Sequence, residues 1–124
     1  MNDVTALALA ARDGDRVALS DFIRRTWPDV ARLARAMAGH DQAEDVAQET
    51  YLRALRALPA YRGESGGRTW LMSIARRAAV DSIRSTIRRR RLTRLLARRA
   101  AAGDRGQVPM ADGALTGEML ARLD

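Results

Sequence analysis

The sequence predicts an all-α protein, a small bundle of about four helices with a flexible C-terminal linker. Ala and Leu, both strong helix formers, dominate the apolar 47% of the chain, whereas aromatic residues make up only 4%. No segment alternates apolar and polar residues as a half-buried strand would. With 124 residues, the chain has room for one domain, or for one domain and a tail.

Capping residues and helix breakers place the first two helices. A short helix is expected over residues 4–12. A second runs from a cap at Asp15 to Gly39, a residue suited to the end of a helix. Pro28 lies inside this second helix and is expected to kink or divide it, because proline lacks the backbone N–H that the helix uses.

The same signals place the other two helices. A third is expected from a cap at Asp41, with Glu44 completing a capping box, to Pro59. A fourth starts near Arg68 and continues at least to Arg84, and its extension to Arg99 is left open.

The chain after the fourth helix is rich in Gly, Pro and Asp, which favours a linker. We therefore expect one domain over residues 1–99, and a linker or the start of another domain over residues 100–124. The sequence has no long apolar run, no signal peptide and no Cys, so we expect a cytoplasmic protein without a membrane partner.

Positive charge is concentrated in one part of the chain. The net charge is +7, and every basic residue is Arg. Residues 59–99 contain 12 Arg and 2 acidic residues, a net charge of +10, while the segments on either side are slightly acidic. This asymmetry indicates a polyanionic partner. Because the absence of Lys suggests biased coding, Arg as such is no evidence of bidentate recognition.

Helical spacing divides the third helix into a core face and an outer face. The residues expected in the core are Ala43, Ala47, Thr50, Tyr51, Ala54 and Leu58. The opposite face carries Asp45, Gln48, Glu49, Leu52 and Arg56. A single exposed leucine among solvated charges is ordinary. The alternative is an apolar anchor within a charged stripe, which suits docking against the helices of another protein.

The fourth helix is expected to turn Trp70, Leu71, Ile74, Ala75 and Ala78 toward the core. Another flank gathers Ser73, Arg77, Arg84 and Arg88, with Arg76 further round. Eight Arg and no acid lie between residues 84 and 99. This run is either a solvated helix end or a phosphate-binding segment. In the second case, binding would be steeply salt-dependent, with a log–log slope of roughly −0.7 per contact on single strands and −0.9 on duplex.

Catalysis, metal binding and cofactor binding are not expected. The single histidine, His40, follows Gly39 in a connection, and no Cys or second His accompanies it. Acids such as Asp41 and Glu44 are favoured in the first turns of a helix by capping and by the helix dipole. The glycines after Tyr61 do not form a phosphate-binding fingerprint. We therefore predict that the protein is not an enzyme.

Two stretches, DQAEDVAQETYLRALRAL and YRGESGGRTWLMSIARRAAVDSIRS, resemble region 2 of bacterial sigma-70 family factors, specifically the small extracytoplasmic-function (ECF) class. The resemblance covers about residues 4–90. It implies a helical domain that docks on the clamp-helices coiled coil of the RNA polymerase β′ subunit. It also implies that the last helix and the preceding loop engage the promoter −10 element, holding bases of the non-template single strand out of the stack.

The resemblance assigns roles to particular residues. Polymerase docking falls on Asp45, Gln48, Glu49, Leu52 and Arg53, to which the outer face adds Arg56. DNA contact falls on Tyr61, Arg62, Gly63, Glu64, Ser65, Gly66, Gly67, Arg68, Arg76, Arg77 and Arg84, to which the polar flank adds Ser73 and Arg88. An anti-sigma factor is a further expected partner, by family analogy alone.

The loop also suits base capture on physical grounds. Reading a flipped base requires backbone that approaches closely and groups that bond its edge. Gly63, Gly66 and Gly67 allow such an approach, and Glu64 and Ser65 supply polar groups. We interpret Trp70, by contrast, as a core residue.

The sequence departs from common family forms at three positions. Gly67 replaces a frequent aromatic residue, Met72 a frequent Tyr or Phe, and Arg77 a frequent Asn. The bases that are read and the depth of melting therefore stay open. The chain ends just after ALTGEMLARLD, where such factors carry a −35-binding domain. We therefore expect a fragment or a truncated protein, which binds polymerase core but initiates poorly.

Two other functions remain open from the sequence. One is a duplex-DNA-binding helical transcriptional regulator that uses the basic helix. The other is a helical interaction module whose Arg-rich end binds RNA or an acidic protein.

Overall fold

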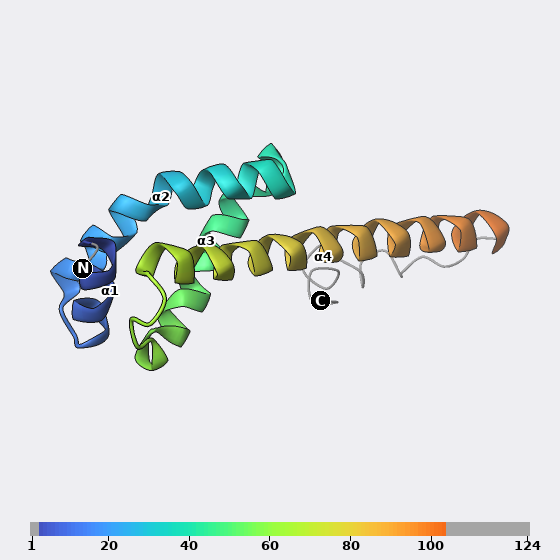
Figure 1. Cartoon of the computed structure of the whole chain (residues 1–124). Helices are drawn as coiled ribbons and strands as arrows, with labels where there is room; N and C mark the ends of the chain where they lie inside the picture. The colour runs from blue at the N-terminus through green and yellow to red at the C-terminus, as the bar shows by residue number, and fades with distance from the viewer. Residues whose placement is uncertain (1–2, 104–124) are drawn as a thin grey trace. The chain divides into compact units, whose positions relative to one another are not determined.

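The computed structural model describes residues 3–103, and within this range the chain is helical without any strand. The helices are α1 (Asp3–Arg12), α2 (Arg16–Ala38), α3 (His40–Ala57), the short 3₁₀ helix η1 (Leu58–Ala60) and α4 (Gly67–Gly103), as Figure 1 shows. The all-α fold class is confirmed. The chain divides into two compact units, Met1–Val80 and Asp81–Asp124, which are described separately.

The second helix begins as predicted but is not divided. The Asp15 carboxylate accepts hydrogen bonds from the backbone amides of Val17 and Ala18, both at 3.0 Å, and so caps α2. The helix continues through Pro28 to Ala38, so of the two expected outcomes the division is wrong, and the kink stays a prediction. Thr26 and Val30, on either side of the proline, are both fully buried, and this packing holds the helix together.

Gly39 joins α2 and α3 without any other residue between them. Its amide donates to the carbonyl of Arg35 at 3.1 Å, and its φ is 89°. Helix α3 begins directly afterwards at His40, one residue before the predicted cap at Asp41. Asp41 is therefore a first-turn residue, and the predicted capping box is wrong because Gly39 already occupies the cap position.

The core of the first unit consists mainly of small side chains. All six residues assigned to the core face of α3 are buried, together with Val46, which the sequence analysis did not name. Leu71 and Ala75 of α4 are buried in one cluster, against which Trp70 and Ile74 pack partly buried, and Ala78 is buried in a second cluster with Ala34 and Val46. Because so many of these residues are alanine, the helix backbones can approach closely.

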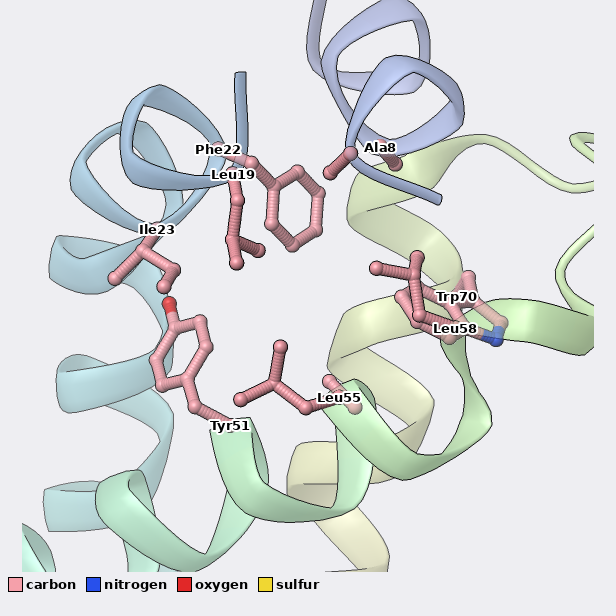
Figure 2. Close-up of a pocket in the computed structure, with 10 residues that line it drawn as sticks. Ala8, Leu19, Phe22, Ile23, Tyr51, Leu55, Leu58 and Trp70 are labelled. Carbon is pink, nitrogen blue, oxygen red and sulfur yellow. The ribbon is translucent and has the colours of Figure 1, made fainter. Parts of the chain in front are cut away.

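A small apolar pocket lies between α1, α2 and α3. Figure 2 shows Phe22, Tyr51 and Leu55 facing it, and Trp70 also lines it. Its volume of about 10 Å³ is that of a single water molecule, and its lining is apolar. This pocket therefore has room for about one water molecule, and its apolar walls offer that water no hydrogen-bond partner.

In the second unit, the described part is the continuation of α4 to Gly103. The extension to Arg99 is thus helical. Residues 100–103, assigned to the linker, also belong to α4, and the rest of the predicted linker lies outside the described residues. The predicted domain boundary at residue 99 stays a prediction.

Candidate functional site

The outer face of α3 presents an apolar side chain among charged ones. Leu52 is 52% exposed, although it lies next in sequence to the buried Tyr51. Asp45, Gln48 and Arg56 are also exposed, so these three and Leu52 share the accessible side of the helix. We call Asp45, Gln48, Glu49, Leu52, Arg53 and Arg56 the α3 stripe.

Glu49 and Arg53 form an ion pair in the middle of the α3 stripe. Arg53 Nε lies 2.9 Å from Glu49 Oε2, and the two side chains are 28% and 40% exposed. An exposed pair at this spacing contributes little to stability, about 0–1 kcal/mol. The pair joins two charged side chains one helical turn apart, and Leu52 between them is exposed.

The loop after η1 starts with a buried tyrosine. Tyr61 is 5% exposed, its ring packs against Trp70 with centroids 4.6 Å apart, and its hydroxyl donates to the carbonyl of Ser65 at 2.5 Å. The ring of Tyr61 is thus packed inside the protein, and its contact with DNA stays a prediction. The Tyr61 ring supports the loop through its hydrogen bond to Ser65 and its contact with Trp70. Trp70 packs against the core, as predicted.

The outward part of the loop consists of polar and small residues. Arg62, Glu64, Ser65 and Gly66 are exposed, and Gly63 is half-buried. Arg62 Nη1 lies 3.7 Å from Glu64 Oε2, but both side chains are nearly 80% exposed, so solvent screens this pair. These residues are accessible to a ligand, as the sequence analysis expected.

Gly67 lies inside the protein rather than at its surface. A Cβ built on this residue would lie 3.0 Å from the Val4 carbonyl oxygen and 3.1 Å from Thr5 Cα, both in the backbone of α1. Its amide donates to Thr5 Oγ1 at 2.8 Å. The absence of a side chain at Gly67 allows this close packing against α1, and its contact with a base stays a prediction.

The Arg68 side chain is engaged within the protein. Its guanidinium pairs with the Asp29 carboxylate, which also pairs with Arg32 at 2.9 Å. Burial raises the pKa of the nearby Tyr51. The positive charge of Arg68 acts to lower this pKa, and the negative charge of Asp29 acts to raise it. With its side chain 40% exposed, Arg68 keeps part of its surface accessible.

The remaining predicted DNA contacts lie along α4. In the first unit, Arg76 and Arg77 are exposed, while the Ser73 hydroxyl donates to the carbonyl of Trp70 at 2.7 Å. In the second unit, Arg84 and Arg88 are exposed, as are Arg90, Arg91, Arg94, Arg98 and Arg99. Each unit therefore presents its own exposed arginines.

The part of the chain that the structure describes contains neither a candidate group of metal ligands nor a helix able to cross a membrane. Residues 3–103 contain no group of three or more His, Cys, Asp or Glu side chains arranged to hold a metal ion. His40 is exposed at the start of α3. No helix in this range is both long and apolar enough to cross a membrane.

Sequence reasoning missed the contribution of α1 to the site. Thr5, Leu9 and Arg12 all reach the loop, which comes about fifty residues later in the chain. No local motif predicts these contacts, because hydrophobic periodicity shows which face of a helix is buried but not which distant segment it contacts. The Asp29–Arg68 pair was missed for the same reason.

Comparison with known proteins identifies the family of this chain. The profile of Sigma-70 region 2 matches residues 22–91, more than half of the chain. The chain belongs to the sigma-70 family. Within this region 2 match lie the α3 stripe and the loop, whereas α1 precedes it and the end of α4 follows it.

Curated relatives place this sigma-70 protein in the ECF class. It is 45% identical over 91 residues to the ECF RNA polymerase sigma factor SigC of Mycobacterium tuberculosis, covering 73% of this chain and 49% of that protein. It is 46% identical over 52 residues to the ECF RNA polymerase sigma factor SigX of Bacillus subtilis, covering 40% of this chain and 27% of that one. The chain thus spans about half the length, or less, of these relatives.

Proposed function

We propose that this chain is the part of an ECF sigma factor that binds RNA polymerase core and recognises the promoter −10 element to direct transcription initiation. The observation that carries the proposal is the exposure of Leu52 within the α3 stripe. An apolar side chain that is 52% exposed and flanked by an ion pair and further charges has the character of an interface anchor. The partner that fits it is a pair of helices, the β′ clamp helices.

Two substitutions test polymerase docking. Leu52→Ala removes the apolar anchor, and Asp45→Arg reverses a charge at the N-terminal end of the α3 stripe. Each is expected to weaken binding to polymerase core by roughly tenfold or more, the effect of losing one interface anchor. The dissociation constant is measured by anisotropy of the labelled chain titrated with core enzyme.

Matched controls distinguish the α3 stripe from a general effect. Leu95→Ala removes the same atoms from a leucine that is also 52% exposed, but in α4. Glu44→Arg makes the same charge change one residue before Asp45. Both controls are expected to retain the affinity of the wild type. Unchanged affinity for Leu52→Ala and Asp45→Arg would sink the docking proposal.

The DNA part of the proposal rests on the outward loop residues and the exposed arginines. Arg62, Glu64, Ser65 and Gly66 offer charge, hydrogen-bonding groups and accessible backbone for an unstacked base. Arg76 and Arg77 of α4 can bind phosphates, which supplies affinity without reading sequence. Arg84 and Arg88 are proposed to extend this backbone contact.

Fluorescence anisotropy with three DNA probes tests this assignment. The chain is titrated with single-stranded non-template −10 DNA, with the same sequence as duplex, and with a scrambled single strand. A preference for the single-stranded −10 sequence is expected. A preference for duplex would favour a duplex-binding regulator instead, and equal affinity for all three would favour binding of RNA or an acidic protein through the Arg-rich helix.

Three further inferences depend on this function. The chain is a binding factor rather than an enzyme, since its proposed roles are docking and recognition. An anti-sigma protein is the expected regulator, an inference that rests on membership of the ECF class alone. A cytoplasmic location follows from the need to reach polymerase and promoter.

A further inference from the structure

One face of α1 contacts the loop of residues 61–67 at three points. Thr5, Leu9 and Arg12 follow one another at intervals of four and three residues, which places them on the same side of the helix. Thr5 meets Gly67, Leu9 meets Gly63, and Arg12 meets Tyr61. The start, the middle and the end of the loop therefore each have a partner on α1.

The contact at the end of the loop is a buried hydrogen bond. Thr5 is 5% exposed, and its Oγ1 accepts from the Gly67 amide at 2.8 Å. Gly67 is the first residue of α4, and the first amides of a helix lack partners within that helix. The Thr5 hydroxyl therefore fixes where α4 begins and where the loop must end.

The contact at the start of the loop is a charged hydrogen bond. Arg12 Nη1 donates to the Tyr61 carbonyl at 2.9 Å, while its Nε donates to Asp13 at 3.0 Å, which keeps the guanidinium in place. Between the two ends, Gly63 lies close enough to Leu9 that an added Cβ would be 3.2 Å from Leu9 Cδ1.

We propose that Thr5 and Arg12 are positioning residues that hold the loop in the conformation that reads a −10 base. This rests on the proposed function of the loop. Each acts on the loop backbone, at Gly67 and at Tyr61, whereas the groups proposed to bond the base belong to the exposed Glu64 and Ser65. Both lie in α1, before the region 2 match begins.

The physical reason is the cost of ordering the loop. A short loop with several glycines has many conformations of similar energy. If only a fraction of molecules holds the reading conformation, the apparent affinity for the matching base falls by that fraction. Hydrogen bonds from α1 raise the fraction of molecules that hold the reading conformation before DNA binds. Loss of one such bond should therefore reduce discrimination between DNA sequences more than it reduces the general attraction to phosphate.

The first test changes the Thr5 hydroxyl in the whole chain. Thr5→Val keeps the branched shape and removes the acceptor, whereas Thr5→Ser restores a hydroxyl. The measured quantity is the ratio of affinities for a labelled single-stranded −10 oligonucleotide and for its scrambled version. Loss of one hydrogen bond predicts a roughly two- to tenfold lower ratio for Thr5→Val. Thr5→Ser is expected to recover most of it.

Thr50→Val is the matched control for Thr5→Val. Thr50 is buried like Thr5, but its hydroxyl donates to the carbonyl of Val46 at 2.7 Å within α3 rather than to the loop. It should lower stability without changing the ratio. A ratio that falls equally for both variants would overturn the proposal, since general destabilisation would then explain the effect.

The second test uses Arg12, where loss of charge must be separated from loss of the loop contact. Arg12→Met removes the donor and one positive charge, and Arg16→Met removes the same charge from an exposed neighbour. Both should weaken binding to scrambled DNA equally. Only Arg12→Met is expected to lower the affinity ratio.

Hydrogen exchange at the Gly67 amide supplies the independent readout. Thr5→Val should speed exchange of this amide, and Thr5→Ser should slow it again. Faster exchange with an unchanged affinity ratio would overturn the positioning role while leaving the proposed function intact. Absence of a −10 preference in the wild type would instead refute the proposed function, before any variant is compared.

Discussion

Replacing Gly67 by alanine tests most directly how the loop packs against α1. The added Cβ would lie 3.0 Å from the Val4 carbonyl oxygen, 3.1 Å from Thr5 Cα and 3.2 Å from the Thr5 nitrogen. These are backbone atoms of a helix, which cannot swing aside like the end of a side chain. At Gly66 the nearest atom is Thr5 Oγ1 at 3.7 Å, an ordinary contact, so Gly66→Ala is the matched control.

The expected size of the effect follows from two opposing contributions. A compatible Gly-to-Ala change stabilises a protein by about 0.4–1 kcal/mol through the unfolded chain. Forcing an extra carbon into a tightly packed site costs about 1–3 kcal/mol. For Gly67→Ala we expect the free energy of unfolding to fall by about 1–2 kcal/mol. Each kcal/mol corresponds to a fall in Tm of roughly 4–8 °C. For Gly66→Ala, where only the first contribution applies, we expect a gain of about 0.4–1 kcal/mol.

Urea denaturation followed by far-UV circular dichroism measures both variants against the wild type. The midpoint should fall for Gly67→Ala with an unchanged slope, because the surface exposed on unfolding stays the same. If Gly66→Ala is destabilised as much as Gly67→Ala, or if Gly67→Ala is more stable than the wild type, the close approach of α1 is refuted.

Three further changes have defined outcomes. Phe22→Ala should lower the free energy of unfolding by about 3–5 kcal/mol, because the ring is 3% exposed; a loss below about 1 kcal/mol in thermal melts would contradict its core position. Burial raises the pKa of Tyr51 above the usual value of 10.0, so the neutral phenol stabilises the fold below that pH and the benefit is lost as pH rises through the raised pKa. At neutral pH, Tyr51→Phe should be about 1 kcal/mol less stable than the wild type, because it lacks the 2.6 Å hydrogen bond to Thr26. As the pH is raised in urea titrations, the free energy of unfolding should then fall less for Tyr51→Phe than for the wild type. Replacing Arg76 and Arg77 together by Gln should reduce the salt slope of single-strand binding by about 1.4, measured by anisotropy, and an unchanged slope would mean that neither binds phosphate.

The sequence predicts the helices and their inner faces well, because both depend on near neighbours. Asp15 caps α2 through amides two and three residues away, and Gly39 ends the helix where expected. The inner face of α3 follows from the helical repeat alone. Leu52 stands out because the same repeat turns an apolar side chain outward.

Contacts between distant segments are what the sequence could not provide. Tyr61 and Gly67 look like ligand-binding residues, since aromatic rings and glycines are common where a base is held. The structure buries the Tyr61 ring beside Trp70 and buries Gly67 against the backbone of α1. No local pattern encodes the second contact, which joins residues about sixty positions apart. Pro28 illustrates the same limit, since burial of Thr26 and Val30 outweighs the local preference for a break.

The junction at Gly39 has a consequence for how α3 can meet a partner. Gly39 has a φ of 89°, and an added Cβ would meet nothing within 4 Å. Other residues are therefore disfavoured at this position by the backbone conformation and not by lack of space. No neighbouring linker residue can absorb a change in length, and each helical residue corresponds to about 100° of rotation. One inserted residue would therefore turn α3 so that either Tyr51 leaves the interior or Leu52 enters it. The direction in which α3 presents its leucine is set by the number of residues at this corner as much as by their identity.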